Sequence, residues 1–373
     1  MKQLPVCLFL FLSTFACSQQ GLLSETTPRV PESGQRVLFI GQDLQSIGDY
    51  VSECKACPTP GGVATYINFD GILRKDFYGA LGWTKKKKVF DEDIDWGGGP
   101  LNAFKAVNNY PNSDVQIGLY LVDHCREIAE GQLDAELKQL GKFFMAHSET
   151  AFYLRIGYEF DGEWNNYYPE DYVAAFKHIV DAFRAAGIEN VAYVWQSCTS
   201  PIDDIIEGFR EDITRYYPGD EYVDWFAYSW FLSPNEGMEG STQIDLANEV
   251  LDLARKHGKP VMVAESSNQG YDNLRLTNRN IAEIIDGPAG KELVNKSPEA
   301  IWAEWYDPFF DFIYANEDVI KAVTYINANW DGQDLWNSPY EQGYWGDSRI
   351  QVNKYIQERW LEEITKPGWI HGK

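Results

Sequence analysis

Basic side chains are scarce in this chain. Its 373 residues include 32 Lys and Arg against 56 Asp and Glu, which gives a net charge of −24. Nucleic acids and anionic membrane surfaces both attract clustered lysines and arginines, so neither is expected as the main partner. A short lysine run at residues 85–88 is interpreted as a solvated face, with contact to an acidic polysaccharide as the alternative.

Motifs of several enzyme classes are also missing. The chain contains no G-x-S-x-G nucleophile elbow, no Walker A phosphate loop and no H-E-x-x-H zinc motif. Residues 91–95 resemble the start of a calcium-binding EF-hand loop. However, Trp96 stands where that loop needs glycine and Asn102 where it needs a bidentate glutamate. We therefore predict no metal site.

Cysteines are few, and four remain after the N-terminal segment: Cys54, Cys57, Cys125 and Cys198. An even number in an exported protein is consistent with disulfides. Cys54 and Cys57 could close on each other or form half of a metal site, but no second C-x-x-C completes a zinc site. The three pairings of the four cysteines stay open.

The N-terminus has the features of a signal peptide. A lysine is followed by an apolar stretch at residues 5–15, which is too short to cross a bilayer. The residues up to Cys17 resemble a bacterial lipoprotein cleavage site, where the cysteine becomes lipid-modified; plain secretion is the alternative. We predict a signal peptide over 1–17 and a flexible polar tether over 18–35. The protein is then secreted or attached as a lipoprotein to the cell surface or outer membrane of a bacterium.

From residue 36 onwards, short apolar runs alternate with helical patterns. Residues 172–183 show the clearest helical spacing, which ends before Gly187. Eight strands with intervening helices are typical of the α/β class and of the (β/α)8 TIM barrel, so we predict one barrel over 36–373. The predicted strands are 36–40, 63–68, 115–122, 152–157, 191–195, 223–228, 261–264 and 322–326.

Two of these apolar runs stop at a glutamate, Glu159 after the fourth and Glu265 after the seventh. β/α barrels place catalytic groups at the carboxyl ends of their strands, so we expect the two carboxylates to face each other across one cleft. Two carboxylates are the minimum equipment for hydrolysing a glycosidic bond. Aromatic residues make up 15% of the chain, and this surplus suits stacking against sugars.

Arg155 lies four residues before Glu159. An even offset on a strand puts both side chains on one face, so Arg155 is predicted to point into the barrel. A cation buried there needs an anion, and Glu265 is the expected partner. Glu159 would act as an acid only if burial or a neighbouring charge raises its pKa. The alternative is a structural ion pair between Glu159 and Arg155.

The run Arg155-Ile156-Gly157-Tyr158-Glu159 resembles clan A glycoside hydrolases, which carry the acid/base at strand four and the nucleophile at strand seven. Within that clan, an arginine four residues before the acid/base is similar to glycoside hydrolase family 26, the β-mannanase family. The resemblance covers the barrel and implies that Glu159 is the acid/base, that Glu265 is the nucleophile and that no cofactor is needed. Tyr158 departs from the family, which has histidine there. That position normally helps to recognise the sugar beside the scissile bond, so mannan as the substrate stays open, and a related, distinct family is the alternative.

The same resemblance implies further substrate contacts. Tyr228, at the end of strand six, is expected to hydrogen-bond the nucleophile, and Trp330, at the end of strand eight, to carry the sugar ring. Trp195 and Trp230 are further stacking candidates, with packing in the core as the alternative for each. Trp164 lies in the wet aromatic loop after Glu159 and suits a sugar subsite. Polar groups at strand ends that could bind hydroxyls are Gln196, Asp43, Asp123 and His124.

Together these features predict a retaining endo-glycoside hydrolase that cleaves a β-linked polysaccharide through two glutamates, and a monomer is expected. A non-catalytic, glycan-binding surface lipoprotein on a barrel scaffold is the alternative from another class. An inverting or exo-acting enzyme is the nearer alternative. The identity of the sugar is set by loop residues and stays open.

Overall fold

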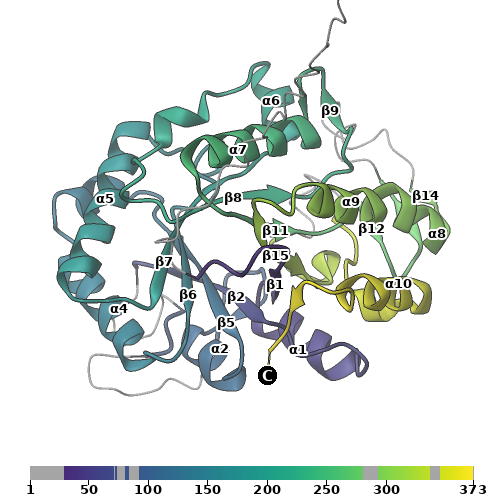
Figure 1. Ribbon diagram of the computed structural model, residues 1–373, viewed down its shortest axis with the longest axis horizontal. Coiled ribbons are helices and arrows are strands. Elements are labelled where there is room, and N and C mark those ends of the chain that lie inside the picture. Colours follow the sequence, from purple (N-terminus) through teal and green to yellow (C-terminus); the bar gives the residue numbers. More distant parts are fainter. Residues whose placement is uncertain are drawn as a thin grey trace, which may run out of the picture.

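Eight parallel strands close into a barrel in the computed structural model, which describes residues 29–70, 72–73, 80–83, 92–279, 293–336 and 345–372. Within these residues the strand order is β15-β11-β8-β7-β6-β5-β2-β1, and pairing of β1 with β15 closes the ring (Figure 1). The barrel strands are β1 (Arg36–Gly41), β2 (Gly62–Asn68), β5 (Asp114–Tyr120), β6 (Phe152–Ile156), β7 (Val191–Ser197), β8 (Trp225–Trp230), β11 (Val261–Ser266) and β15 (Ile320–Ile326). The predicted TIM barrel is confirmed.

Helices pack around the outside of the barrel (Figure 1). Their apolar faces follow from the helical spacing of the sequence: in α5 every buried position from Tyr172 to Phe183 lies on one side, and the helix ends before Gly187. The helices are α1 (Leu44–Glu53), α2 (Ala103–Asn109), α3 (Cys125–Ala129), α4 (Asp134–Ala146), α5 (Pro169–Ala185), α6 (Pro201–Glu207), α7 (Gln243–His257), α8 (Pro298–Ile301), α9 (Asp307–Ala315) and α10 (Lys354–Ile364). A π-helical turn, Trp302–Tyr306, joins α8 to α9.

The described residues also include short strands of two residues each. The last of them, β16 (Trp369–Ile370), pairs with the start of β1 and so ties the C-terminal segment to the amino end of the barrel. The others are β3 (Ile94–Asp95), β4 (Pro100–Leu101), β9 (Gly237–Met238), β10 (Ser241–Thr242), β12 (Tyr271–Asp272), β13 (Thr277–Asn278) and β14 (Val294–Asn295). The 3-10 turns are η1 (Ile213–Tyr216), η4 (Trp330–Gly332) and η5 (Ile350–Val352).

Strand alternation divides the core into two layers. Side chains that point into the barrel form a compact apolar floor that includes Phe39, Tyr153, Val194, Trp225 and Met262. The intervening side chains point outwards and pack between the strands and the helices in a larger core. Because successive residues of a strand face opposite sides, the parity of each position decides whether it reaches the barrel interior.

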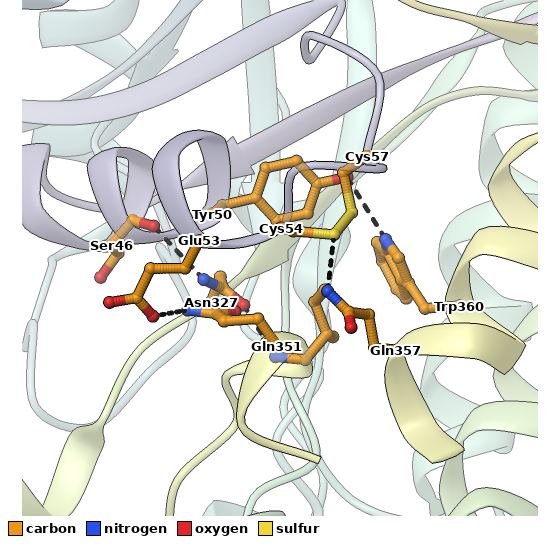
Figure 2. The surroundings of a disulfide bond; sticks show 10 residues. Ser46, Tyr50, Glu53, Cys54, Cys57, Asn327, Gln351, Gln357 and Trp360 are labelled. Atoms are coloured by element: carbon orange, nitrogen blue, oxygen red, sulfur yellow. Dashed lines mark hydrogen bonds between the residues drawn. A yellow bond between two sulfur atoms is a disulfide. The ribbon is translucent and has the colours of Figure 1, made fainter. Parts of the chain in front are cut away.

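One disulfide joins Cys54 to Cys57, directly after α1. Figure 2 shows it beside the C-terminal helix α10, where the Gln357 amide donates to the Cys54 sulfur at 3.2 Å and the Trp360 indole donates to the Tyr50 hydroxyl at 3.3 Å. Cys125 and Cys198 are buried free thiols. Of the pairings left open by the sequence, the structure therefore selects the local one.

Some predictions concern residues outside this description. The signal peptide at 1–17 with Cys17, most of the tether at 18–35, and the lysine run at 85–88 all lie outside the described residues. Across the part of the chain that the structure describes, none of the helices has the length and apolar character needed to cross a membrane.

Candidate active site

The loop that carries Glu159 turns sharply at the carboxyl end of β6. Gly157 has a φ of +55°, and a Cβ there would lie 2.6 Å from the Tyr172 ring, so the position requires glycine. Glu159 itself has a φ of +51°, in the left-handed region that L-residues seldom adopt. The Asn165 side-chain amide donates to the carbonyls of Tyr158 and Glu159, at 3.0 and 2.8 Å, and holds the turn in place.

Glu265 reaches the site because β11 is irregular. Met262 and Ala264 face the barrel interior, so simple alternation would point Glu265 outwards. The register between β8 and β11 shifts between Val263 and Glu265, and Glu265 becomes paired with Ser229. This bulge turns the carboxylate towards the mouth of the barrel, as bulges beside active sites commonly do.

Arg155 is the charged centre of the site. It is fully buried, and its Nη1 forms an ion pair with Glu265 Oε1. The guanidinium also lies over the rings of Tyr66 and Tyr158, with its carbon 4.8 and 5.2 Å from the ring centroids. The ion pair predicted between Arg155 and Glu265 is confirmed. The contact is a charge-assisted hydrogen bond inside a largely dry site.

Glu159 has the opposite electrostatic setting. It is only 8% exposed, and burial is the main reason why its pKa lies well above the usual range; the nearby negative charge of Glu265 raises the pKa further. A hydrogen bond from the Ser229 hydroxyl, 2.7 Å from Glu159 Oε1, lowers the pKa in part. One carboxyl group is thus arranged to hold a proton, and the other is paired with a cation. This division suits a general acid beside a nucleophile.

A chain of hydrogen bonds links the two carboxyl groups. Arg155 Nη1 donates to Gln196 Oε1 at 2.8 Å, and Gln196 Nε2 donates to Ser229 Oγ at 3.1 Å. The same amide nitrogen lies 3.5 Å from Glu265 Oε1. Gln196 therefore lies beside both Arg155 and Glu265, and its contact with substrate hydroxyls stays a prediction. Ser229 was missed, although its even offset from Trp225 on one strand could have indicated an inward position.

Three predicted sugar-binding residues lie elsewhere. Trp195, Tyr228 and Trp230 are fully buried and point outwards, because their strand positions have the opposite parity to Gln196 and Ser229. Trp195 stacks on Phe160, with ring centroids 4.4 Å apart, and the Trp230 ring packs against α9. The predicted contacts of these residues with sugar are therefore wrong.

The role predicted for Tyr228 is wrong for the same reason. Its hydroxyl is buried and finds no hydrogen-bond partner among the described residues, so it does not reach Glu265. The donors that contact Glu265 are Arg155 and Gln196 instead.

Trp330 follows β15 as predicted, but its ring is covered. It is 1% exposed, stacks on Trp345 with centroids 4.7 Å apart, and donates to Ser348 Oγ at 2.9 Å. The half-buried rings in this cluster are Phe231, Trp336 and Trp345, which sequence reasoning did not select. The prediction that Trp330 itself carries the sugar ring is therefore wrong.

The remaining predicted residues have different surroundings. Trp164 is 53% exposed, with its ring against the Gly162 backbone, and Tyr158 is half-buried beside Tyr66 and Tyr120. Asp43 caps α1 and accepts the amide hydrogens of Gln45 and Ser46, so its carboxylate is used structurally. His124 pairs with Asp70 and Glu127, and Asp123 is exposed.

Comparison with known proteins places this geometry among glycoside hydrolases. The chain is 34% identical over 349 residues to "Beta-1,3-xylanase TXYA" of a Vibrio species, covering 91% of this chain and 67% of that protein. It is 33% identical over 346 residues to a "Beta-1,3-xylanase" of an Alcaligenes species, covering 92% of this chain and 66% of that protein. The chain thus spans about two thirds of the length of both relatives. No protein-family model matches it.

Solved structures support the fold. An endo-β-1,4-mannanase double mutant from Cellulomonas fimi superposes with a TM-score of 0.56 at 12% sequence identity, over 91% of this chain and 72% of that one. At this identity the likeness concerns the barrel and not the substrate.

Proposed function

Because the chain belongs with the β-1,3-xylanases of glycoside hydrolase family 26, we propose that it hydrolyses β-1,3-linked xylan by endo cleavage with retention of configuration. The carrying observation is the contrast between the two glutamates: Glu265 is paired with buried Arg155, while burial and the Glu265 charge keep the pKa of Glu159 high. The choice of β-1,3-xylan follows from the names of the relatives, and the two-glutamate mechanism follows from the surroundings of Glu159 and Glu265.

In the first step Glu265 attacks the anomeric carbon, and Glu159 gives its proton to the departing glycosidic oxygen. Arg155 supports this step because its ion pair and hydrogen bond hold the Glu265 carboxylate in place. In the second step Glu159, now ionised, takes a proton from water, and the resulting hydroxide displaces the sugar from Glu265.

Substrate contacts are proposed for rings that are accessible. Tyr158 immediately precedes Glu159 and is half-buried, so it can contact the sugar beside the scissile bond. Trp164 exposes more than half of its surface in the same loop and offers a flat face for a second sugar. A polysaccharide substrate fits the exported or lipid-anchored location predicted from the N-terminal segment.

The decisive experiment compares wild type with Glu265→Ala and Glu159→Ala on β-1,3-xylan. Both variants are expected to lose at least about a thousandfold in turnover while keeping the circular dichroism spectrum of the wild type. Early products analysed by mass spectrometry should be a ladder of oligosaccharides, as endo cleavage requires. Full turnover by Glu265→Ala would contradict the assignment, and binding without cleavage by the wild type would support the non-catalytic alternative.

A further inference from the structure

The hydrogen-bond chain from Arg155 to Glu159 can run in only one direction. A guanidinium group donates hydrogen bonds and cannot accept them, so the oxygen of the Gln196 amide must face Arg155. The amide nitrogen must then face Ser229, which accepts from it at 3.1 Å. The orientation of the amide is fixed by this chemistry.

The Ser229 hydroxyl carries a single proton, and a carboxyl oxygen of Glu159 accepts its hydrogen bond. Its hydroxyl lies 2.7 Å from Glu159 Oε1 and donates to it. In a protonated carboxyl group the carbonyl oxygen is the stronger acceptor, so the oxygen that accepts from Ser229 is the one without the acid's own proton. That proton therefore resides on the other oxygen, Oε2, to which none of the described residues donates a hydrogen bond.

We propose that Ser229 is a positioning residue for catalysis: its hydroxyl occupies Oε1 of Glu159 and so assigns the proton for the leaving group to Oε2. This inference rests on the proposed role of Glu159 as the acid. Arg155 thereby serves both glutamates, Glu265 by direct ion pairing and Glu159 through Gln196 and Ser229.

The electrostatic surroundings of Glu159 set the sign of the expected effect. The titratable groups that act on it are Glu265 from β11, Arg155 from β6, and Asp161 from its own loop. Tyr158 and Cys198 also face it, and burial raises the pKa of both, so they stay neutral. The Ser229 hydroxyl favours the ionised carboxylate; its removal therefore raises the pKa of Glu159.

The test is the pH profile of kcat/KM for Ser229→Ala on the polysaccharide. The alkaline limb, which reports loss of the Glu159 proton, is expected to move up by about one pH unit. At the optimum kcat should fall about tenfold with little change in KM, because the proton is no longer confined to one oxygen. Ser229→Thr keeps the hydroxyl, so its alkaline limb should lie at the same pH as that of wild type.

A second substrate separates proton delivery from general damage. A dinitrophenyl glycoside of the same sugar has a leaving group that departs without protonation, so Ser229→Ala should cleave it at nearly the wild-type rate of glycosylation. The matched control is Ser266→Ala, which deletes an equally buried hydroxyl on β11 that donates to the Thr324 carbonyl at 2.6 Å. This control should leave the alkaline limb in place.

An unmoved limb in folded Ser229→Ala, or an equal movement in Ser266→Ala, would overturn the inference. If Ser229→Ala does not fold, Ser229→Cys gives the same measurement, with a smaller shift expected from its weak donor. Glu159→Ala separates failure of the proposed function from failure of the role of Ser229. If that variant keeps the alkaline limb, the proposed function fails; if it loses the limb while Ser229→Ala leaves it unchanged, only the role of Ser229 fails.

Discussion

Two buried arginines occupy opposite ends of the barrel. Arg36 starts β1 at the amino end, and Arg155 lies near the carboxyl end of β6; each is at most 2% exposed and each lies over two aromatic rings. Their partners differ. Arg36 contacts Glu317 at 3.3 Å, and that side chain is 60% exposed, whereas Glu265 beside Arg155 is 8% exposed.

The two arginines differ in how deeply their partner carboxylates are buried, and only Arg155 contacts a glutamate of the proposed catalytic pair. Glu317 remains solvated, so its contact with Arg36 is screened by water and holds the end of the barrel weakly. The Glu265 carboxylate is largely removed from water, and Arg155 is its cationic partner. A site that must keep a reactive carboxylate ionised therefore needs the second arrangement, although it contributes little net stability.

The largest expected effect comes from Arg155→Met. It leaves the Glu265 carboxylate buried without its cation, so kcat should fall at least about a thousandfold and the free energy of unfolding by about 3–5 kcal/mol. Steady-state kinetics and urea unfolding measure the two quantities. Turnover close to wild type would remove Arg155 from the mechanism.

Arg36→Met is the matched variant at the other end of the barrel. Because Glu317 can return to solvent, we expect a loss of only about 1–2 kcal/mol in unfolding free energy, chiefly from lost packing on Tyr314 and Trp369. The kcat at a temperature where the variant is folded should equal that of wild type. A kcat that drops as far as in Arg155→Met would abolish the distinction between the two ends.

Glu159→Gln tests how burial of a carboxyl group makes the stability of the protein depend on pH. The pKa of Glu159 is raised in the folded protein, so folding favours its protonated form; that contribution is fully present below the unfolded pKa and is lost as the pH rises through the folded pKa. The amide cannot ionise. Glu159→Gln should thus unfold at a higher temperature than wild type at alkaline pH and at a similar temperature in acid.

Thermal unfolding followed across pH measures this difference, with Glu317→Gln as the control. That substitution removes a carboxylate that is already in water, and we expect the same pH dependence as wild type. If the melting temperature of Glu159→Gln equals that of wild type at every pH, ionisation of Glu159 does not destabilise the folded protein.

The smallest effect is expected for Tyr228→Phe. The hydroxyl that it deletes is buried without a hydrogen-bond partner in the described structure, so both kcat and the unfolding free energy should stay within about 0.5 kcal/mol of wild type. A large loss of kcat would instead restore the role that the sequence suggested for this tyrosine.

The sequence predicted the architecture well because buried parallel strands and amphipathic helices have local signatures. All eight strands and the pattern of α5 are present close to the predicted bounds. It also anticipated the contact between Arg155 and Glu265, since an inward arginine in a dry interior requires an anion. The aromatic candidates within and after the strands failed because they were chosen by residue type, without regard to the side of the strand on which each ring lies.

By itself, the sequence determined that apolar segments end in acidic residues on one side of a barrel, because hydrophobic period and strand length are properties of neighbouring residues. Only the tertiary structure decided that a bulge turns Glu265 inwards, that Trp195 and Trp230 face the helices, and that Ser229 meets Glu159. These outcomes depend on register between strands that are far apart in the chain. A shift of one residue in this register moves each side chain of the strand from the barrel interior to its exterior, or the reverse.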